Sequence, residues 1–314
     1  AAGRVAAVAG ATTPQDHTHS MGEDATSPVH SLWDSPWMVP GLTLLLLGVL
    51  LLLRVLRRPR KHTPVAMSTS EFRPFLLEEK IPITSGEGVK CPVYRFRFSL
   101  PPGESLDLPL GHHVQLKANI GGKDIFRPYT PVTTNATKGY FDLVIKIYPS
   151  GNMTKFLYAM NVGMTIEMKK PKGRMEYQPG KWKSIGMIAG GTGITPMLQM
   201  VQEILAMEEN SASKTNLSLI FANVNAADII LKSKLDKLAS KHENFYIHYV
   251  LNEAPPEWTG SVGFVTPAII KEHMPPPQDE DIQILCCGPP PMMNALEKHL
   301  AELNYNLETQ AFFF

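Results

Sequence analysis

The sequence predicts three parts: an apolar membrane anchor, a β-rich domain and a parallel α/β domain. A predominantly apolar run at residues 37–56 has the length of a bilayer crossing. Short β-rich segments separated by proline and glycine turns follow it, and after Trp182 strand and helix patterns alternate. Such alternation is typical of a parallel sheet. With 314 residues, 44% of them hydrophobic, the chain is long enough to bury more than one core.

Charge and cysteine content exclude several classes of protein. The formal net charge is only +1, and no run interleaves basic and aromatic residues, so we expect no nucleic-acid partner. Cys91, Cys286 and Cys287 are too few for a disulfide framework, and this usage fits a reducing compartment. No Cys or His spacing is typical of a metal site, and we expect none.

The N-terminal region predicts attachment to a membrane. The run at 37–56 reads WMVPGLTLLLLGVLLLLRVL, with tryptophans at its start and a basic cluster directly after it. Because basic residues stay on the cytosolic side, the domains that follow are expected in the cytosol. A cleaved signal peptide is the alternative. Residues 1–36 are polar and expected to be disordered, and 57–71 form a basic linker.

We expect residues 72–180 to form the β-rich domain, as an antiparallel barrel or sandwich. The β-rich segments are Val93–Phe98, His113–Ala118 and Tyr140–Tyr148. We expect residues 181–314 to form the α/β domain. Its expected strands are Ile185–Ala189, Leu217–Ala222, Phe245–Leu251 and Ile282–Cys287. Its expected helices are Pro196–Met207, Ile229–Leu238, Phe264–His273 and Met292–Leu303.

A glycine turn follows the first strand of the α/β domain. In the segment AGGTGITPM, Gly190 and Gly191 end the strand, Thr195 suits a helix N-cap and Pro196 suits the first helical position. Ligands of parallel sheets bind beyond the carboxyl ends of the strands, where helix N-termini attract phosphate. The spacing differs from G-x-G-x-x-G, so the turn alone leaves both a nucleotide site and a plain tight turn open.

A second glycine-ended strand occurs at ILCCGPPPMM. Cys287 stands at the last strand position, and Gly288 precedes a helix that begins with prolines. The carboxyl ends of parallel strands share one edge of the sheet, so the two turns are expected to form one floor. We interpret Cys286 as a small buried apolar residue and Cys287 as a residue that faces a reactive ring.

The segment RPYT in the β-rich domain suggests a site for an anionic aromatic cofactor. Arg127 and Tyr129 are two positions apart, which places a guanidinium and a phenol on one face of a strand. A surface arginine on a turn is the alternative. Val144, Lys146 and Tyr148 also alternate onto one face, and a helix start near Met153 offers a second anion site.

With these residues assembled, the sequence resembles the flavoprotein pyridine-nucleotide cytochrome reductases, the family that includes the NADH-cytochrome b5 reductases. The resemblance covers residues 72–314 and is carried by RPYT, GGTGITPM and CGPPPM in that order. It implies a six-stranded antiparallel FAD barrel, an NADH-binding α/β domain and a flavin in the cleft between them. The last three residues, all phenylalanine, resemble the family's aromatic end near the flavin, although a buried last strand is the alternative.

The resemblance also assigns residue roles. The residues implied to bind FAD are His113, Arg127, Pro128, Tyr129, Thr130, Val144, Lys146, Tyr148, Gly151, Asn152, Met153 and Thr154. Those implied to face NADH or both rings are Gly190, Gly191, Thr192, Thr195, Phe221, Asn223, Asn252, Cys287, Gly288, Pro289, Met292 and Phe314. Thr130, Lys146, Thr192 and Cys287 are implied to lie at the reacting atoms. Asn152 departs from the family, which usually has a lysine there.

The implied activity is electron transfer from NADH through FAD to cytochrome b5. NADH is favoured over NADPH because residues 221–225 carry no cation that could bind the 2′-phosphate of NADPH. Asp228 is explained as a helix N-cap. Asn252 stands where an acidic residue would exclude NADPH, so some NADPH use stays open. An acidic haem protein would be attracted by a basic cluster of Lys169, Lys170, Lys172, Arg174, Lys181 and Lys183.

The alternatives are a reductase of a quinone or another haem protein, and an anchored scaffold without turnover. The expected location is the cytosolic face of the endoplasmic reticulum or the mitochondrial outer membrane, with a monomeric catalytic part.

Overall fold

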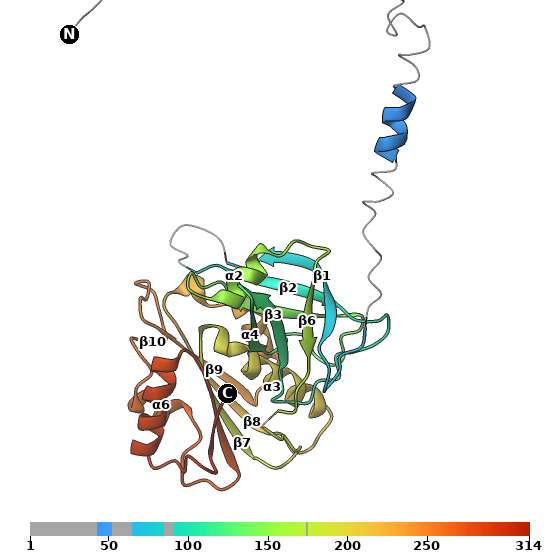
Figure 1. Cartoon of the computed structure of the whole chain (residues 1–314). Coiled ribbons are helices and arrows are strands. Elements are labelled where there is room, and N and C mark those ends of the chain that lie inside the picture. The colour runs from blue at the N-terminus through green and yellow to red at the C-terminus, as the bar shows by residue number, and fades with distance from the viewer. Residues whose placement is uncertain (1–42, 52–64, 85–90, 174) are drawn as a thin grey trace, which may run out of the picture. The chain divides into compact units, whose positions relative to one another are not determined.

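Figure 1 shows the computed structural model, which describes residues 43–51, 65–84, 91–173 and 175–314. The chain divides into one unit at residues 1–60 and another at 61–314. In the first unit residues 43–51 are helical and exposed. The remainder of the predicted anchor 37–56, the segment 1–36 and the linker up to residue 64 lie outside the described residues. Over the part of the chain that is described, no helix has the length and apolar character needed to traverse a bilayer.

The β-rich region forms an antiparallel six-stranded sheet in the order β4-β3-β6-β1-β2-β5. Its strands are β1 Arg73–Pro82, β2 Val93–Ser99, β3 Val114–Ile120, β4 Lys123–Tyr129, β5 Tyr140–Lys146 and β6 Thr165–Lys169. The first half of β1 pairs with β6 and the second half with β2, with an irregularity between Leu77 and Glu79 where the sheet bends. Alternate residues such as Phe96 and Phe98 point inward and are fully buried. The six-stranded antiparallel barrel that the resemblance implies is a half-barrel sheet in the structure, because β4 and β5 at its two edges are not paired with each other.

The C-terminal region forms a parallel six-stranded sheet in the order β10-β9-β8-β7-β11-β12. Its strands are β7 Ser184–Gly190, β8 Asn216–Asn223, β9 Phe245–Leu251, β10 Ser261–Val262, β11 Ile282–Cys287 and β12 Ala311–Phe313. Its helices are α3 Ile194–Met207, α4 Lys232–Lys241, α5 Pro267–His273 and α6 Pro290–Glu302, with short 3-10 helices at Gly191–Gly193 and Ala226–Asp228. The predicted strand-helix alternation is confirmed.

Alternation along the central strands produces two cores. Met187 and Leu219 face one side, where α3 and α4 pack, whereas Ile188 and Ile220 face the other side, where α5 and α6 pack. The first core also contains buried residues of the β-rich region, among them Val132. One continuous apolar core therefore joins the two sheets, and it positions the cleft between them.

Several predicted helix starts are wrong. The helix expected at Ile229 begins at Lys232, because Leu231 has a φ of 59° in the left-handed region and interrupts it. Asp228 is not a helix N-cap, since the Asn225 side chain accepts from the Asp228 N–H instead. The helix expected at Phe264 begins at Pro267. There the Thr266 side chain caps the helix by accepting from the Ile269 N–H.

The remaining differences lie at the glycine turns. Gly193, not Thr195, is the N-cap of α3, because a 3-10 turn carries the helix start two residues upstream. Thr195 lies inside the helix, where its hydroxyl donates to the Thr192 carbonyl at 3.2 Å. The helix α6 begins at Pro290, two residues before its expected start. Phe312 and Phe313 lie in a last strand, β12, Phe314 follows it, and all three side chains are half-buried.

Candidate functional site

A cleft of about 1090 Å³ lies between the two sheets. The β-rich side contributes β4, β5 and the helix α2, Asn152–Ala159, and the other side contributes the carboxyl ends of β7, β8 and β11. The predicted site residues that line it are His113, Arg127, Pro128, Tyr129, Thr130, Val144, Lys146, Tyr148, Gly151, Asn152, Met153, Thr154, Gly190, Gly191, Thr192, Thr195, Asn223, Asn252, Cys287, Gly288, Pro289, Met292 and Phe314. Phe221 differs: its side chain is fully buried in the core beneath the cleft.

The floor of the cleft is formed by backbone segments in very close approach. Strands β7 and β11 pair in register, with Ala189 opposite Cys287. A Cβ placed on Gly193 would come within 2.1 Å of the Cys287 carbonyl oxygen, and one on Gly190 within 2.5 Å of the Met292 sulfur. Only glycine permits the first of these contacts, because the obstructing atom belongs to the backbone, whereas the Met292 side chain could shift. The two glycine-ended strands form one floor, as predicted, so a flat ring could approach the backbone closely.

The two adjacent cysteines have different surroundings. Cys286 is fully buried in the core, and burial raises the pKa of its thiol. Cys287 is half-buried at the edge of the cleft, and burial raises its thiol pKa to about 11. Cys287 therefore carries a neutral thiol near neutral pH. A neutral thiol is a poor nucleophile but an adequate small contact for an uncharged ring.

Arg127 and Tyr129 lie on β4 and both face the cleft. Arg127 is exposed, and its Nη1 donates to the Phe126 carbonyl at 2.7 Å. Burial raises the pKa of Tyr129 to about 12, although the nearby Arg127 charge acts in the opposite direction. The phenol is therefore neutral. This pair presents a guanidinium fork and an uncharged ring, the chemistry that an anionic aromatic ligand requires.

Lys146 and Asp228 form an ion pair across the cleft. The Lys146 ammonium on β5 lies 3.4 Å from the Asp228 carboxylate, which belongs to the 3-10 helix after β8, and both side chains are less than 20% exposed, at 18% and 17%. Lys146 is therefore not a simple solvated lysine. The same pair connects the two sides of the cleft and places one positive and one negative group in its lining.

The N-terminus of α2 is the predicted second anion site. Gly151 is its N-cap and provides no side-chain acceptor for the first-turn N–H groups, and residues 151–154 line the cleft. The Thr154 hydroxyl donates to the Gly151 carbonyl at 3.2 Å and accepts from the Tyr148 N–H at 3.2 Å, which closes the turn. Asn152 adds no charge here, so binding would rest on backbone N–H groups and the helix dipole.

Asn223 is the strongest local indication of a ligand. It ends β8, lines the cleft and is only 6% exposed, yet neither its Oδ1 nor its Nδ2 has a hydrogen-bond partner. Leaving a buried amide unpaired costs about 1–3 kcal/mol. A ligand that offers a donor and an acceptor would remove this cost. The residues present thus fit a dinucleotide on the parallel sheet and a flavin nucleotide on the antiparallel sheet.

Sequence reasoning missed several residues of the cleft, including Gly111, Lys172, Asp228, Phe264 and His299. His299 lies on α6 with an unpaired, buried Nδ1. Its spacing of seven positions from Met292 places both on one helix face, a signal that the sequence does contain. Phe264 left no such signal, because it lies in a loop.

The predicted basic cluster is divided in the structure. Lys172 lines the cleft and Lys169 lies over the Phe72 ring, near β4. Lys170 is committed to the Leu106 and Asp107 carbonyls, at 3.1 and 2.7 Å. Lys183 pairs with Asp281 at the start of β7, the end of the strand away from the cleft. Lys181 precedes it, and Arg174 lies outside the described residues. The cluster is therefore not one surface around the cleft.

Comparisons with known proteins agree with this geometry. A family model described as an oxidoreductase FAD-binding domain matches residues 80–177, and one described as an oxidoreductase NAD-binding domain matches residues 187–298. The chain is 46% identical over 269 residues to NADH-cytochrome b5 reductase 1 of Neosartorya fischeri, covering 82% of this chain and 84% of that protein. It is 45% identical over 255 residues to NADH-cytochrome b5 reductase 1 of Dictyostelium discoideum, with 81% and 85% coverage.

Solved structures show the same fold. The cytochrome b5 reductase domain of Ulva prolifera nitrate reductase superimposes with a TM-score of 0.70 at 32% identity, over 79% of this chain and 99% of that one. The CS-b5R domains of human Ncb5or in the NAD+ form give a TM-score of 0.65 at 29% identity, over 78% and 69%.

Proposed function

The chain belongs to the NADH-cytochrome b5 reductase family, and on this basis we propose that it transfers electrons from NADH through FAD to cytochrome b5. One observation carries the proposal: residues 127–130 at the end of β4 line the same cleft as the glycine floor at the ends of β7 and β11. One side suits a flavin nucleotide and the other a nicotinamide dinucleotide. FAD accepts a hydride from NADH and returns single electrons, which connects a two-electron donor to a one-electron haem protein.

On the antiparallel sheet, we assign Arg127 to the pyrophosphate of FAD. The α2 N-terminus at Gly151–Thr154 supplies a second contact with the same phosphates. Tyr129 lies along the flavin with its neutral phenol. Thr130, the next residue, stands at the reacting edge of the ring. His113, directly before β3, and Val144 on β5 would flank the flavin, and both line the cleft.

On the parallel sheet, we assign Asn223 to a polar group of NADH, because its buried amide has a free donor and a free acceptor. The glycine floor and Cys287 receive the nicotinamide, with Thr192 above it. We assign Asn252 to a contact with the adenosine ribose. Residues 221–225 offer no cation to a 2′-phosphate, so NADH is the preferred donor over NADPH.

Lys146 has a role at the contact between the two rings. Its ammonium is held by Asp228 at 3.4 Å, so its position does not depend on the ligand. Placed beside the cleft, it stabilises negative charge that develops during transfer. The residues supply no nucleophile; their contribution is alignment and the exclusion of water from the reacting faces.

We propose that cytochrome b5 docks near Lys172, which lines the cleft, and Lys169, whose ammonium lies over the Phe72 ring. Complementary charge would accelerate association more than it tightens the complex. Residues 72–180 would form the FAD domain and 181–314 the NADH domain. Residues 37–56 would anchor the monomeric enzyme to the endoplasmic reticulum or the mitochondrial outer membrane, with the catalytic part in the cytosol.

Stopped-flow spectroscopy tests this function. The purified chain is reconstituted with FAD, mixed with NADH or NADPH in parallel, and then mixed with oxidised cytochrome b5 or with a soluble quinone. We expect NADH to bleach the flavin faster than NADPH, and cytochrome b5 to reoxidise it faster than the quinone. Failure to bind FAD, or a flavin that stays oxidised with NADH, would contradict the enzyme; faster reoxidation by the quinone would contradict the acceptor.

A further inference from the structure

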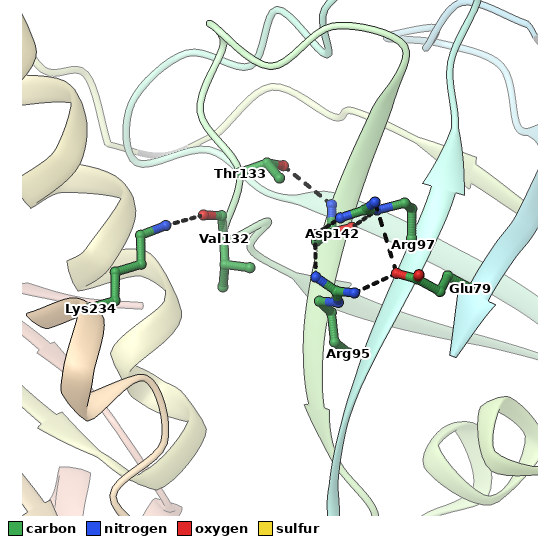
Figure 2. Close-up of polar contacts among 7 residues, drawn as sticks. All are labelled: Glu79, Arg95, Arg97, Val132, Thr133, Asp142 and Lys234. Carbon is green, nitrogen blue, oxygen red and sulfur yellow. Dashed lines mark hydrogen bonds and ion pairs between the residues drawn. The ribbon is translucent and has the colours of Figure 1, made fainter. Parts of the chain in front are cut away.

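The backbone carbonyl of Val132 accepts hydrogen bonds from two side chains of helices that pack on the parallel sheet, and Figure 2 shows the one from Lys234. Val132 lies in the loop between β4 and β5, and it is only 6% exposed. Gln202 of α3 donates from Nε2 at 3.3 Å, and Lys234 of α4 donates from Nζ at 3.4 Å. A carbonyl oxygen has two lone pairs, so both donors can be accommodated. We call Gln202, Lys234 and the Val132 carbonyl the Val132 clamp.

The other side of this loop is fixed to the antiparallel sheet (Figure 2). The Val132 N–H donates to the Asp142 carbonyl at 2.9 Å, and the Asp142 N–H donates to the Thr133 hydroxyl at 3.2 Å. The Asp142 carboxylate, almost fully buried, accepts two hydrogen bonds from Arg97 at 2.8 and 3.0 Å. Arg95 lies 3.7 Å away. Bidentate pairs of this kind are among the more rigid polar contacts.

The Val132 clamp joins the elements that determine how the two rings would meet. Val132 follows Thr130 by two positions, and Thr130 lines the cleft. Gln202 belongs to the helix that begins directly after the Gly191–Gly193 turn, on the opposite side of the cleft. A shift at Val132 would therefore displace Thr130 relative to the glycine floor.

The same helix, α3, makes further contacts across the interface. The Gly111 N–H donates to the buried Gln199 side chain at 3.1 Å, and the Asn135 N–H donates to Glu203 at 2.9 Å. Positions 199, 202 and 203 share one helix face. This polar face of α3 binds backbone groups of Gly111, before β3, and of Val132 and Asn135, after β4. Of these three, Val132 also accepts from a charged side chain, Lys234.

Lys234 is ordered toward this carbonyl rather than directed into solvent. The residue as a whole is exposed, but its ammonium group lies 3.4 Å from the Val132 carbonyl oxygen, and desolvation lowers its pKa while the Asp142 charge acts in the opposite direction. Holding a long side chain in one geometry costs about 1.5–2 kcal/mol of rotamer entropy. Lys232, on the same helix, instead forms a local pair with Asp236 at 2.6 Å.

We propose that Lys234 and Gln202 are positioning residues for hydride transfer: by holding the Val132 carbonyl they set the alignment of the flavin side of the cleft against the nicotinamide side. The inference rests on the proposed function. Neither side chain lines the cleft, so neither is expected to bind NADH or FAD directly. Misplacement of reacting atoms by about 1 Å costs on the order of a hundredfold in rate, so a small loosening is measurable.

The test compares Lys234→Met, Gln202→Leu and Lys234→Arg with the wild type, all as the full chain with FAD. Lys237→Met, an exposed substitution on the same helix, is the matched control. We expect Lys234→Met and Gln202→Leu each to slow the limiting rate of flavin reduction about tenfold, with the NADH dissociation constant changed less than about twofold. Lys234→Arg keeps a donor of similar reach and should restore most of the rate. Lys237→Met should behave as wild type.

A second readout is independent of turnover. Hydrogen exchange at the amides of Gly111 and Asn135, which donate across the interface, should accelerate in Lys234→Met while exchange in β8 and β9 stays unchanged. Unchanged reduction rates in both Lys234→Met and Gln202→Leu would overturn the proposal. So would a parallel loss of FAD and of protection throughout β8 and β9, which indicates a general structural role. Failure of NADH to reduce the wild type would instead refute the proposed function.

Discussion

The α-carbon of Gly193 lies so close to Cys287 that a Cβ on it would be 2.1 Å from the Cys287 carbonyl oxygen. The φ of Gly193 is −60°, a value any residue adopts, so glycine is required here by space alone. Gly191, two positions earlier, has the opposite requirement: its φ is +54°, and nothing lies within 4 Å of its Cβ position.

The two glycines therefore predict different outcomes. Gly193→Ala must separate α3 from β11, because the obstructing atoms belong to the backbone, and we expect a loss of about 3 kcal/mol in the free energy of unfolding. Gly191→Ala costs roughly 1–2 kcal/mol for its left-handed conformation. Urea unfolding of both variants measures the difference. Equal stability of Gly193→Ala and wild type would mean that the start of α3 does not contact the end of β11.

Replacing Cys287 should affect reduction more than binding. Cys287→Ala leaves a space at the edge of the glycine floor, and we expect the limiting rate of flavin reduction to fall about tenfold while FAD stays bound. Because the thiol pKa is about 11, the thiol stays neutral, and the reduction rate should not follow a cysteine titration between about pH 6 and about pH 9. Cys91→Ala is the control. An unchanged rate in Cys287→Ala refutes the placement of Cys287 beside the nicotinamide.

Arg127→Ala should release the flavin. Its exposed guanidinium is the charged donor on β4 that faces the cleft, and hydrogen bonds to charged groups contribute about 1.5–3 kcal/mol. We therefore expect FAD affinity to fall about ten- to hundredfold, measured by fluorescence titration of the apoprotein. Lys123→Ala, an exposed change on the same strand, should leave the affinity unchanged. Full retention of FAD by Arg127→Ala would remove Arg127 from the pyrophosphate site.

Protonation of His112 is expected to lower the stability of the folded protein in acid. Its Nδ1 accepts from the Gly173 N–H at 3.1 Å, and burial lowers its pKa, although a backbone contact with Met175 acts in the opposite direction. The unfolded chain, with an ordinary value of about 6.5, then binds a proton more readily than the folded protein. This contribution to stability is present above that value and is lost as the pH falls through the lower folded value.

His112→Asn tests this contribution, because the amide oxygen retains an acceptor that does not titrate. Urea unfolding at about pH 7.5 and about pH 5.5 should show a smaller loss of stability in His112→Asn than in the wild type, since other histidines contribute equally to both. An equal loss of stability in the two proteins would show that the pKa of His112 is the same in the folded and the unfolded chain.

Local patterns were sufficient for much of the fold and the cleft. The strands Phe245–Leu251 and Ile282–Cys287 end where predicted, because each apolar run is bounded by polar or glycine residues that the chain needs for its turns. Arg127 and Tyr129 share a cleft because residues two apart on a strand share a face. Phe221, which the family resemblance implied as a site residue, lies two positions before the end of β8, and its side chain is fully buried in the core.

The sequence by itself determined the order of the elements, the glycine-ended strands and the motifs that place the chain in its family, because burial periodicity and turn chemistry act over a few neighbouring residues. Only the tertiary structure decided that Lys146 meets Asp228, 82 positions away, and that Lys234 reaches the Val132 carbonyl across 102. It also left the Asn223 amide unpaired at the cleft. Such partners are selected by how the two sheets pack against each other, and no pattern within either segment records that geometry.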